Sequence, residues 1–246
     1  MKIGVYGLGR FGYFWSELLG QKFEVYGYNR TLPVHKPKNV SLVSENKILQ
    51  CDVLFLCVSI SSLESVLLNI SDRIKPGCLV FDTCSVKVYP VNLMKSILKN
   101  NINIIATHPM FGPDSGKNSV KDLPIVFIPV RDSGNFAKFW KNIFLEFEMR
   151  VIEITAEIHD KDAAFTQGVT HFIGRVLNEL DLKESEIATT GYKSLLALVE
   201  QTCNDPLQLF MDLQHFNPYT HNMRQELNDS LKKTMDMLAN ADPEKD

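Results

Sequence analysis

Short apolar runs alternate with stretches of helical spacing over residues 1–150. Lys2–Tyr6 and Phe23–Tyr28 have the composition of strands, and Arg10–Leu19 between them places apolar residues at the intervals of an amphipathic helix. Asp52–Val58 is almost entirely apolar, as expected of a strand that is buried on both faces of a parallel sheet. This alternation predicts βαβ units and a doubly wound, mostly parallel α/β sheet.

Later segments continue the same alternation. Ser61–Ile70 is predicted to be a helix, with Ser61 or Ser62 as its cap. Further strands are predicted at Gly77–Asp82, Ile102–Thr107 and Pro124–Val130.

The pattern changes near residue 151. Ala156–Leu180 and Gly191–Ala239 have helical spacing and contain no convincing strand. Asp205-Pro206 and Asn217-Pro218 interrupt this half, because the residue before a proline avoids the helical region. We therefore predict a sheet domain over residues 1–150 and an all-helical domain over residues 151–246.

Composition excludes several classes of protein. The chain has 246 residues, 45% of them hydrophobic, and a net charge of −3, so we expect no binding to nucleic acid or to an anionic membrane. Its five cysteines lack the spacing of a metal site and indicate reduced thiols. No apolar run approaches the ~18 residues of a membrane helix, and a strand that starts at Lys2 leaves no room for a signal peptide. We expect a cytoplasmic protein without a metal ion.

A glycine pattern follows the first predicted strand. Gly7, Gly9 and Gly12 have GxGxxG spacing, in which the first glycine permits a tight turn and the second lets a pyrophosphate approach the backbone. The third lets the helix pack closely on the strand. In this context the motif predicts a Rossmann-type dinucleotide-binding domain over residues 1–150, the alternative being a purely structural turn. The predicted cofactor contacts are Gly7, Leu8, Gly9, Arg10, Phe11, Gly12, Val58 and Ser59.

The end of the second predicted strand bears on the choice of cofactor. Proteins that bind NAD usually carry a carboxylate there for the ribose 2′-hydroxyl. This chain has Asn29, Arg30 and Thr31 instead. Arg30 could bind a 2′-phosphate while Asn29 and Thr31 donate hydrogen bonds, unless Arg30 is simply a solvent-exposed loop residue. We expect NADP, with NAD as the alternative.

A histidine follows the predicted strand Ile102–Thr107. Open α/β sheets bind ligands at the carboxyl ends of their strands, and the pKa of an imidazole suits proton transfer near neutrality. His108 is therefore a candidate general base, the alternative being a histidine that hydrogen-bonds the backbone. Ser85 follows another predicted strand and is expected at the same sheet edge, as a catalytic partner or as a helix cap.

Two further groups of residues are candidates for substrate contact. Three continue the loop after His108, and three lie on one face of the first long helix of the second domain, where His171 could instead serve helix packing. They are Ser115, Gly116 and Lys117 in the loop, and Gln167, Thr170 and His171 on the helix.

These motifs together resemble the prephenate and arogenate dehydrogenases of tyrosine biosynthesis, above all the plant-type arogenate dehydrogenases. The resemblance covers nearly the whole chain. It rests on Gly7–Gly12, Asp82–Lys87, Thr107–Gly116, His159–Lys161, Thr170-His171, Gly191–Leu196 and Val199–Thr202.

The resemblance implies a reaction and roles for individual residues. The substrate of that family is a cyclohexadienyl ring with a 4-hydroxyl and a ring carboxylate, which is oxidised by hydride transfer to NADP and loses CO2 as it becomes aromatic. His108 would accept the proton of the 4-hydroxyl, and Ser85 would orient His108 or that hydroxyl. The resemblance also implies a homodimer formed through the helical domain.

One departure from the family pattern concerns the substrate. Many prephenate-using relatives carry an arginine before the Asp-Pro element to bind the side-chain carboxylate, but Tyr192–Asp205 contains none. Glu200 lies near that place and could favour the ammonium of arogenate, unless it is a solvated surface residue. Arg224 is a further candidate for the carboxylate.

We expect arogenate as the preferred substrate and prephenate as the alternative. A β-hydroxyacid-type dehydrogenase would need a lysine on the first long helix of the second domain, where Lys161 lacks the expected surroundings. A third hypothesis is a nucleotide sensor without catalytic activity. The presence of both His108 and Ser85 argues against it.

Overall fold

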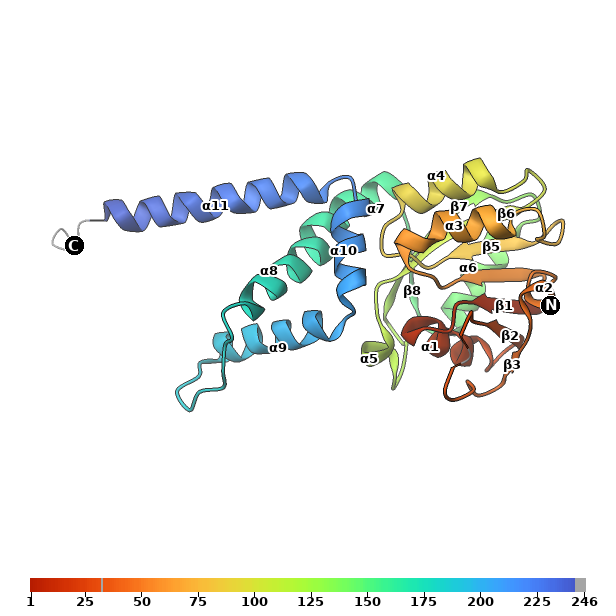
Figure 1. Ribbon diagram of the computed structural model, residues 1–246, viewed down its shortest axis with the longest axis horizontal. Coiled ribbons are helices and arrows are strands. Elements are labelled where there is room, and N and C mark those ends of the chain that lie inside the picture. Colours follow the sequence, from red (N-terminus) through yellow and green to blue (C-terminus); the bar gives the residue numbers. More distant parts are fainter. Residues whose placement is uncertain (32, 242–246) are drawn as a thin grey trace. The chain divides into compact units, whose positions relative to one another are not determined.

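Two compact units make up the chain. The computed structural model describes residues 1–31 and 33–241, and the chain divides into Met1–His159 and Asp160–Asp246 (Figure 1). The strand β8 (Arg150–Glu153) pairs in parallel with β7 (Pro124–Arg131) in the sheet of the first unit. Residues 151–159 therefore belong to the first unit, rather than to the helical one as we expected.

The first unit is built on one eight-stranded sheet with the order β3-β2-β1-β4-β5-β6-β7-β8. Every neighbouring pair is parallel except β6 and β7. The doubly wound, mostly parallel sheet is thus confirmed. Sequence patterning missed β3 and β8, because these edge strands are only partly buried and their polar residues leave no apolar run like those of β4 and β5. The remaining strands are β1 (Lys2–Tyr6), β2 (Glu24–Tyr28), β3 (Val40–Leu42), β4 (Val53–Leu56), β5 (Leu79–Asp82) and β6 (Asn103–Pro109).

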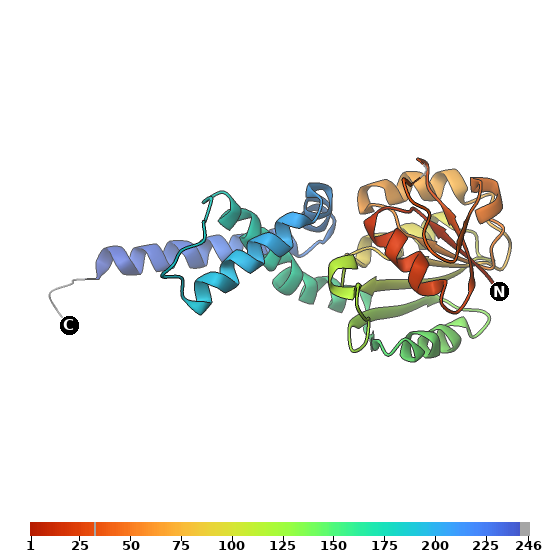
Figure 2. The ribbon, with the colours of Figure 1, turned by 90° about the horizontal axis from the view of Figure 1, so that it is seen from below.

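Helices cover both faces of this sheet (Figure 2). The helices α1 and α6 lie on one face, and α3 and α4 pack together on the other. The cap of α3 is Ser59, without a side-chain hydrogen bond to the helix backbone, so the expected cap at Ser61 or Ser62 is wrong by two or three positions. The helices are α1 (Arg10–Leu19), α2 (Glu45–Ile48), α3 (Ile60–Ile70), α4 (Val88–Ile97), α5 (Pro113–Gly116), α6 (Phe136–Glu146) and α7 (Ala156–Ala163), the last of which runs on into the second unit.

An aromatic cluster fixes α1 and α6 on the central strands. Phe55 of β4 stacks on Phe81 of β5 with ring centroids 4.4 Å apart, and Trp15 of α1 meets Phe55 edge-on. Trp140 and Phe144 of α6 contact the same rings, and all five side chains are completely buried. Such aromatic contacts stabilise a core beyond the area they bury, so the carboxyl ends of β4 and β5 stand on a rigid base.

All described secondary structure of the second unit is helical, as predicted. Close packing joins α8 to α9, because a Cβ on Gly174 would lie only 2.0 Å from Thr202 Oγ1. Both expected breaks occur, since α9 ends before Asp205-Pro206 and α10 ends before Asn217-Pro218. Within residues 1–31 and 33–241 no helix is long and apolar enough to cross a membrane. The elements are the π-helix η1 (Ala164–Gly168), α8 (Val169–Asn178), α9 (Thr190–Asn204), α10 (Leu207–Phe216) and α11 (Thr220–Asn240).

Candidate active site

The glycine turn after β1 has a different constraint at each glycine. Gly7 has a positive φ of 101°, and its N–H donates to Tyr28 O at 2.8 Å. A Cβ on Gly12 would lie 1.9 Å from the carbonyl oxygen of Gly7, so only glycine lets α1 approach the turn. No atom lies within 4 Å of a Cβ built on Gly9, which begins α1 as its cap. The turn is therefore closed by its first and third glycines and open at the second, as a bound pyrophosphate requires.

Asn29 connects this turn to the end of β2. Its Oδ1 accepts from the backbone N–H of Leu8 at 2.9 Å, and its Nδ2 donates to Thr31 O at 2.6 Å. The side chain thus holds the protein's own backbone, whereas we expected it to serve a cofactor phosphate. Arg30 is exposed and forms no hydrogen bond or ion pair with another described residue, so its guanidinium is available to an anion.

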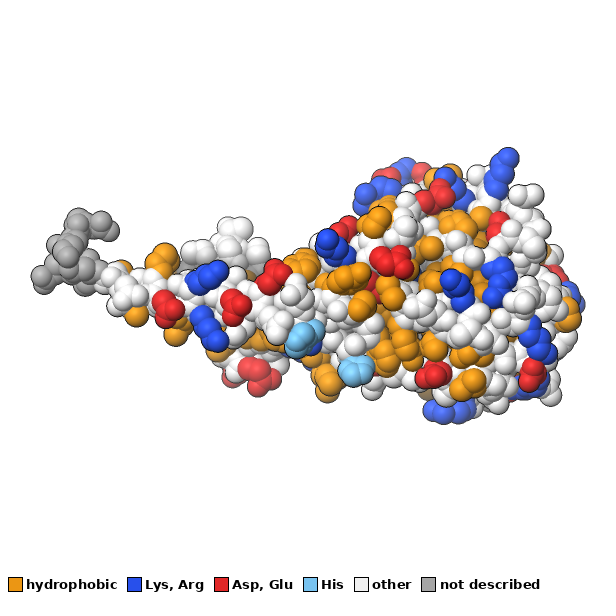
Figure 3. Space-filling view, turned by 90° about the horizontal axis from the view of Figure 1, so that it is seen from above, with side chains coloured by type: hydrophobic (Ala, Val, Ile, Leu, Met, Phe, Trp, Pro, Cys, Tyr) orange, Lys and Arg blue, Asp and Glu red, His pale blue; other side chains and the backbone are white. Residues whose placement is uncertain are grey.

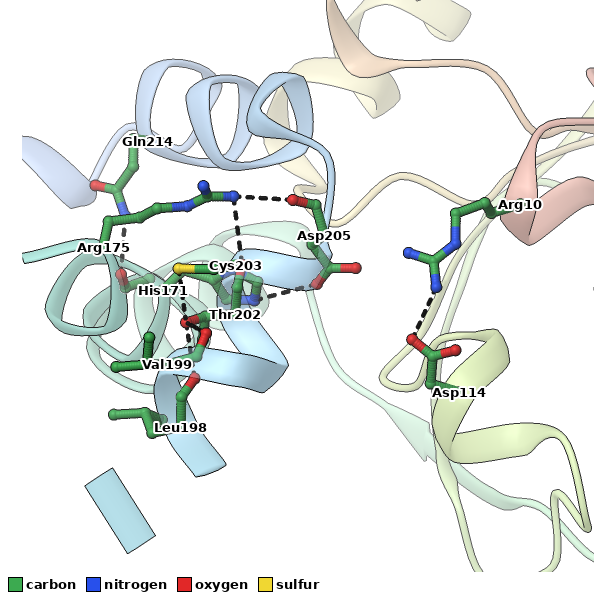
Figure 4. A network of polar contacts seen from close by, with 11 residues as sticks. Arg10, Asp114, His171, Arg175, Leu198, Val199, Thr202, Cys203, Asp205 and Gln214 are labelled. Atoms are coloured by element: carbon green, nitrogen blue, oxygen red, sulfur yellow. Dashed lines mark hydrogen bonds and ion pairs between the residues drawn. The ribbon is translucent and has the colours of Figure 1, made fainter. Parts of the chain in front are cut away.

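The remaining predicted cofactor residues differ in what they expose. The side chain of Leu8 is buried, so this residue offers only its backbone to a ligand. The half-buried Phe11 packs against Trp15 with ring centroids 5.5 Å apart. Val58 borders Gly7, and Ser59 shares a 2.6 Å hydrogen bond with Ser62 at the start of α3. Arg10 forms an exposed ion pair with Asp114 of α5 at 2.8 Å (Figure 4).

His108 lies near the carboxyl end of β6 and is almost completely buried, with 4% of its surface exposed. Its Nδ1 lies 2.9 Å from Nε2 of His159 in α7, with the two rings nearly perpendicular. Burial lowers the pKa of His108 well below its usual range, and the neighbouring His159 and Lys87 lower it further. His108 is therefore an uncharged imidazole at neutral pH, the form that can accept a proton.

A buried ion pair fixes the strand ends beneath His108. Lys87 and Asp82 pair with both side chains completely buried, and Lys87 Nζ also donates to Thr107 O at 2.6 Å. Thr107 Oγ1 donates to Asp82 O at 2.6 Å, and Asp82 accepts from the backbone N–H of Cys84 at 3.0 Å. These bonds tie the end of β5 to the residue before His108, which fixes the imidazole in position.

Ser85 follows β5, the strand beside β6, in the segment that these bonds anchor. It is 7% exposed, and its Oγ has no hydrogen-bond partner among the described residues. A buried hydroxyl without a partner is unfavourable unless a ligand supplies one. The structure therefore leaves Ser85 available to a ligand, and His159 rather than Ser85 hydrogen-bonds His108.

The loop after His108 divides into exposed and packing residues. Ser115 and Lys117 are exposed, whereas Gly116 is buried against α1. A Cβ on Gly116 would lie 2.7 Å from Cζ of Phe14. We expected Gly116 to contact the substrate, but in the structure it lets α5 pack on α1.

In the second unit, three buried polar atoms have no hydrogen-bond partner within the described part of the chain. Two of them are Oε1 of Gln167 in the π-helix and Nδ1 of His171 shortly after it, and the third is Nε of Arg175 in α8. His171 Nε2 lies 4.0 Å from a carboxylate oxygen of Asp205 (Figure 4). Thr170, the preceding residue, is half-buried. Burial lowers the pKa of His171, although the Asp205 carboxylate opposes that shift. A π-turn often marks a functional site, and here it carries Gln167.

Of the charged residues of the second unit, Asp205 rather than Glu200 or Arg224 lies beside the buried His171. Glu200 is exposed on α9, and Arg224 donates to the backbone oxygen and to Oε1 of Gln214 at 3.1 and 2.7 Å. Arg175 donates to Asp205 O at 2.9 Å, beyond the end of α9. Asp205, which we had interpreted only as a helix breaker, is the carboxylate beside the buried histidine. His159 was noted only as part of a motif, because its contact with His108 spans 51 positions.

The sheet, the glycine turn and the helical second unit together define a Rossmann-type dinucleotide-binding protein. Residues 20–153 match the family model of the prephenate dehydrogenase nucleotide-binding domain. Residues 176–245 match the model named TYRAAT1-like, C-terminal domain. The chain therefore belongs to the prephenate dehydrogenase family.

Individual relatives agree with this family. The chain is 37% identical over 230 residues to arogenate dehydrogenase 1, chloroplastic, of Arabidopsis thaliana, covering 89% of this chain and 36% of the relative. It is 36% identical over 236 residues to arogenate dehydrogenase 2, chloroplastic, of the same plant, covering 89% and 64%. The chain thus spans less than two thirds of the length of either relative.

A solved structure shows the same fold. The crystal structure of prephenate dehydrogenase from A. aeolicus, in complex with hydroxyphenyl propionate and NAD+, superposes with a TM-score of 0.74. The superposition covers 97% of this chain and 91% of that one, at 15% sequence identity.

Proposed function

We propose that this protein catalyses the oxidative decarboxylation of arogenate to tyrosine with hydride transfer to NADP. Prephenate is the alternative substrate. The observation that carries the proposal is the buried, uncharged His108, which lies at the carboxyl edge of a sheet that also bears an open glycine turn. Membership of the prephenate dehydrogenase family supports the same reaction.

The residues of the first unit fit a dinucleotide. Gly9 leaves open space at the start of α1, where backbone N–H groups and the helix dipole favour phosphate. Arg30 is exposed, forms no hydrogen bond with another described residue and suits a 2′-phosphate, which favours NADP over NAD. When bound, the nicotinamide supplies a hydride acceptor.

His108 takes the proton in this reaction. Its Nδ1 faces His159, so Nε2 is the atom that receives the proton of the substrate 4-hydroxyl. The hydroxyl proton moves to His108 as the carbinol carbon loses its hydrogen with the bonding electron pair. The bond to the ring carboxylate then breaks and CO2 leaves. Its electron pair moves through the ring onto the new carbonyl oxygen, which takes the proton back from His108 as the ring becomes aromatic. The unpartnered hydroxyl of Ser85 is proposed to hydrogen-bond the substrate hydroxyl.

The second unit supplies the proposed specificity for arogenate. Gln167, Thr170 and His171 are proposed substrate contacts, since two of them keep buried polar atoms without partners. The Asp205 carboxylate beside His171 would attract the ammonium that distinguishes arogenate from prephenate. Tyr192–Asp205 contains no arginine for the side-chain carboxylate, which both substrates carry, so the ammonium is the group by which this site would distinguish them. Ser115 and Lys117 are further candidates in the first unit.

Initial rates decide this proposal. Absorbance of the reduced cofactor is followed with arogenate and with prephenate, each combined with NADP and with NAD. We expect the highest kcat/KM with arogenate and NADP, and Asp205→Asn should narrow the difference between the two substrates. A higher kcat/KM for prephenate would overturn the substrate assignment, and a preference for NAD would overturn the role of Arg30.

A variant of the base tests the chemical step separately. His108→Asn should lower kcat by about 10²–10⁴, the usual contribution of a general base, while the Kd for NADP stays unchanged. Isothermal titration calorimetry measures that Kd without turnover. Near-normal turnover of the variant would refute the role of His108.

The assembly and the compartment are also part of the proposal. We propose a homodimer formed through the helical unit and, as expected from sequence, a reducing compartment such as the cytoplasm. All five cysteines are free, and burial raises the pKa of Cys57 and Cys78 to about 12, which keeps these thiols unreactive. The two plant relatives are named chloroplastic.

A further inference from the structure

The contact between two buried imidazoles is the least expected feature of the first unit. Nδ1 of His108 and Nε2 of His159 lie 2.9 Å apart, and the side chains are 4% and 2% exposed. We propose that His159 is the positioning residue that fixes the tautomer of His108, so that Nε2 of His108 is bare and able to accept a proton. This inference rests on the proposed function, which requires His108 to act as a base.

The tautomer of His108 follows from which of the two nitrogens in this contact carries the hydrogen. Two nitrogens at 2.9 Å form a good hydrogen bond only if one of them carries a hydrogen and the other accepts it. If His108 Nδ1 is the donor, its Nε2 keeps a lone pair and is a base. If His159 Nε2 is the donor, the neutral His108 ring must carry its proton on Nε2 and cannot accept another. Only the first arrangement is compatible with proton uptake from a substrate.

The surroundings hold the two rings in this relation. His108 lies on β6 and pairs in register with Val126 of β7, while His159 lies on α7, where its N–H donates to Thr155 O at 3.0 Å. The rings meet edge to face with centroids 5.1 Å apart and an interplanar angle of 69°. Because both are buried, water competes poorly for the shared hydrogen bond.

An imidazole partner affects the charge of His108 differently from a carboxylate partner. A carboxylate would also fix the tautomer, but it would favour the imidazolium form of His108. Burial lowers the pKa of His108, and the neighbouring His159 and Lys87 lower it further, where a carboxylate would raise it. His159 can therefore orient the base without charging it before the substrate binds.

Nitrogen NMR of the full chain reads the tautomer directly. In 15N-labelled protein at neutral pH, proton couplings distinguish a ring nitrogen that carries hydrogen from one that does not, and the spectrum of His108→Asn identifies the signals of His108 among six histidines. We expect the hydrogen of His108 on Nδ1. A hydrogen on Nε2 in the parent protein overturns the proposal, whatever the variants do.

Two substitutions of His159 separate positioning from folding. In His159→Gln the amide oxygen can still accept from His108 Nδ1, so the tautomer should persist and kcat should stay within about tenfold of the parent. In His159→Leu the acceptor is lost, so both tautomers should appear. Its kcat should fall by more than that, up to the ~10⁴-fold that a base contributes, with KM little changed. His215→Gln, an exposed histidine on α10, should leave the His108 tautomer unchanged.

The outcomes distinguish this proposal from the proposed function. A protein that turns over neither arogenate nor prephenate but carries the Nδ1 hydrogen on His108 refutes the reaction and supports the tautomer. Normal turnover in His159→Leu, or a tautomer unchanged in that variant, refutes the role of His159. If His159→Leu fails to fold, the parent spectrum and His159→Gln decide the matter.

Discussion

Burial determines what chemistry a histidine of this protein can perform. An exposed imidazole is partly charged near neutrality, whereas His108 is enclosed by strand ends, by His159 and by the buried Lys87–Asp82 ion pair. Its lowered pKa keeps it uncharged, and its one hydrogen bond gives the ring a direction. His171 in the second unit is likewise buried and has a lowered pKa, with Asp205 as its charged neighbour.

The titration of these two histidines predicts that the free energy of unfolding falls as the pH decreases through the range in which a free histidine titrates. The pKa values of His108 and His171 are lowered in the folded protein, so the unfolded chain binds more protons below its ordinary histidine pKa of about 6.5. Their contribution is complete above that pH and is lost progressively below it. Urea unfolding at a series of pH values between about 8 and about 5 measures how steeply the free energy of unfolding changes with pH.

His108→Gln should flatten this dependence, because one group with a lowered pKa is gone. His221→Gln removes an exposed histidine of α11 and should leave the slope as it is in the parent. Equal slopes in the parent protein and in His108→Gln would contradict the assignment of a buried, uncharged His108.

Among the secondary-structure elements, the turn between β1 and α1 is the one most constrained by its sequence. Its first glycine has a positive φ and borders Cys57, and its third lies against the first glycine's carbonyl oxygen. The second glycine alone has free space at its Cβ position. Close packing of the turn therefore requires glycine at positions 7 and 12, whereas Gly9 leaves space for the proposed cofactor.

Two alanine substitutions should separate these requirements. Gly12→Ala forces α1 away from the turn, since the new Cβ would lie 1.9 Å from a backbone oxygen, and should cost about 1–3 kcal/mol of the free energy of unfolding. Gly9→Ala meets no protein atom and should unfold like the parent while binding NADP more weakly. Thermal unfolding measures the stability of each variant, and isothermal titration calorimetry measures its affinity for NADP. Equal destabilisation by both substitutions, or undiminished NADP affinity in Gly9→Ala, is the result that would disprove this division.

At the scale of the whole molecule, α11 carries an apolar stripe that no other described part of the chain covers. Thr220 and Met223 are buried where the helix packs on η1, α8 and α10, but residues 228–240 are exposed. Leu231, Met235 and Leu238 are 61%, 63% and 67% exposed, and their spacing places them on one side of the helix. Apolar and charged side chains both occur along its surface (Figure 3). A second copy of the chain could cover the stripe, as the proposed homodimer requires.

Light scattering with size-exclusion chromatography should therefore give the mass of a dimer rather than the 28.0 kDa of one chain. Leu231→Glu places a charge in the stripe and should shift the protein toward the monomer. Lys233→Glu is the matched control, because it lies about 200° around the helix from Leu231 and should leave the dimer intact. A parent protein that elutes as a monomer at every concentration would rule out the proposed assembly.

The sequence by itself determined the features that depend on neighbours along the chain. The alternation of apolar runs predicted the doubly wound sheet and the helical second unit, and the spacing of Gly7, Gly9 and Gly12 predicted the turn. His108 was found because a polar residue that ends a strand must lie at the sheet edge. In each case a few consecutive residues carry the physical constraint, whether it is burial of a strand or space at a Cβ atom.

Only the tertiary structure decided which side chains meet. The partner of His108 is 51 positions away, Leu8 N–H bonds to Asn29 21 positions away, and Asp205 approaches His171 from the residue that follows α9. Sequence patterning did not predict that Asn29 bonds the backbone of the glycine turn or that Asp205 lies beside His171, because periodicity gives the face of an element but not what lies opposite. Hydrogen bonds and pKa shifts act over a few ångströms in space, so they depend on packing between distant segments, which no local pattern records.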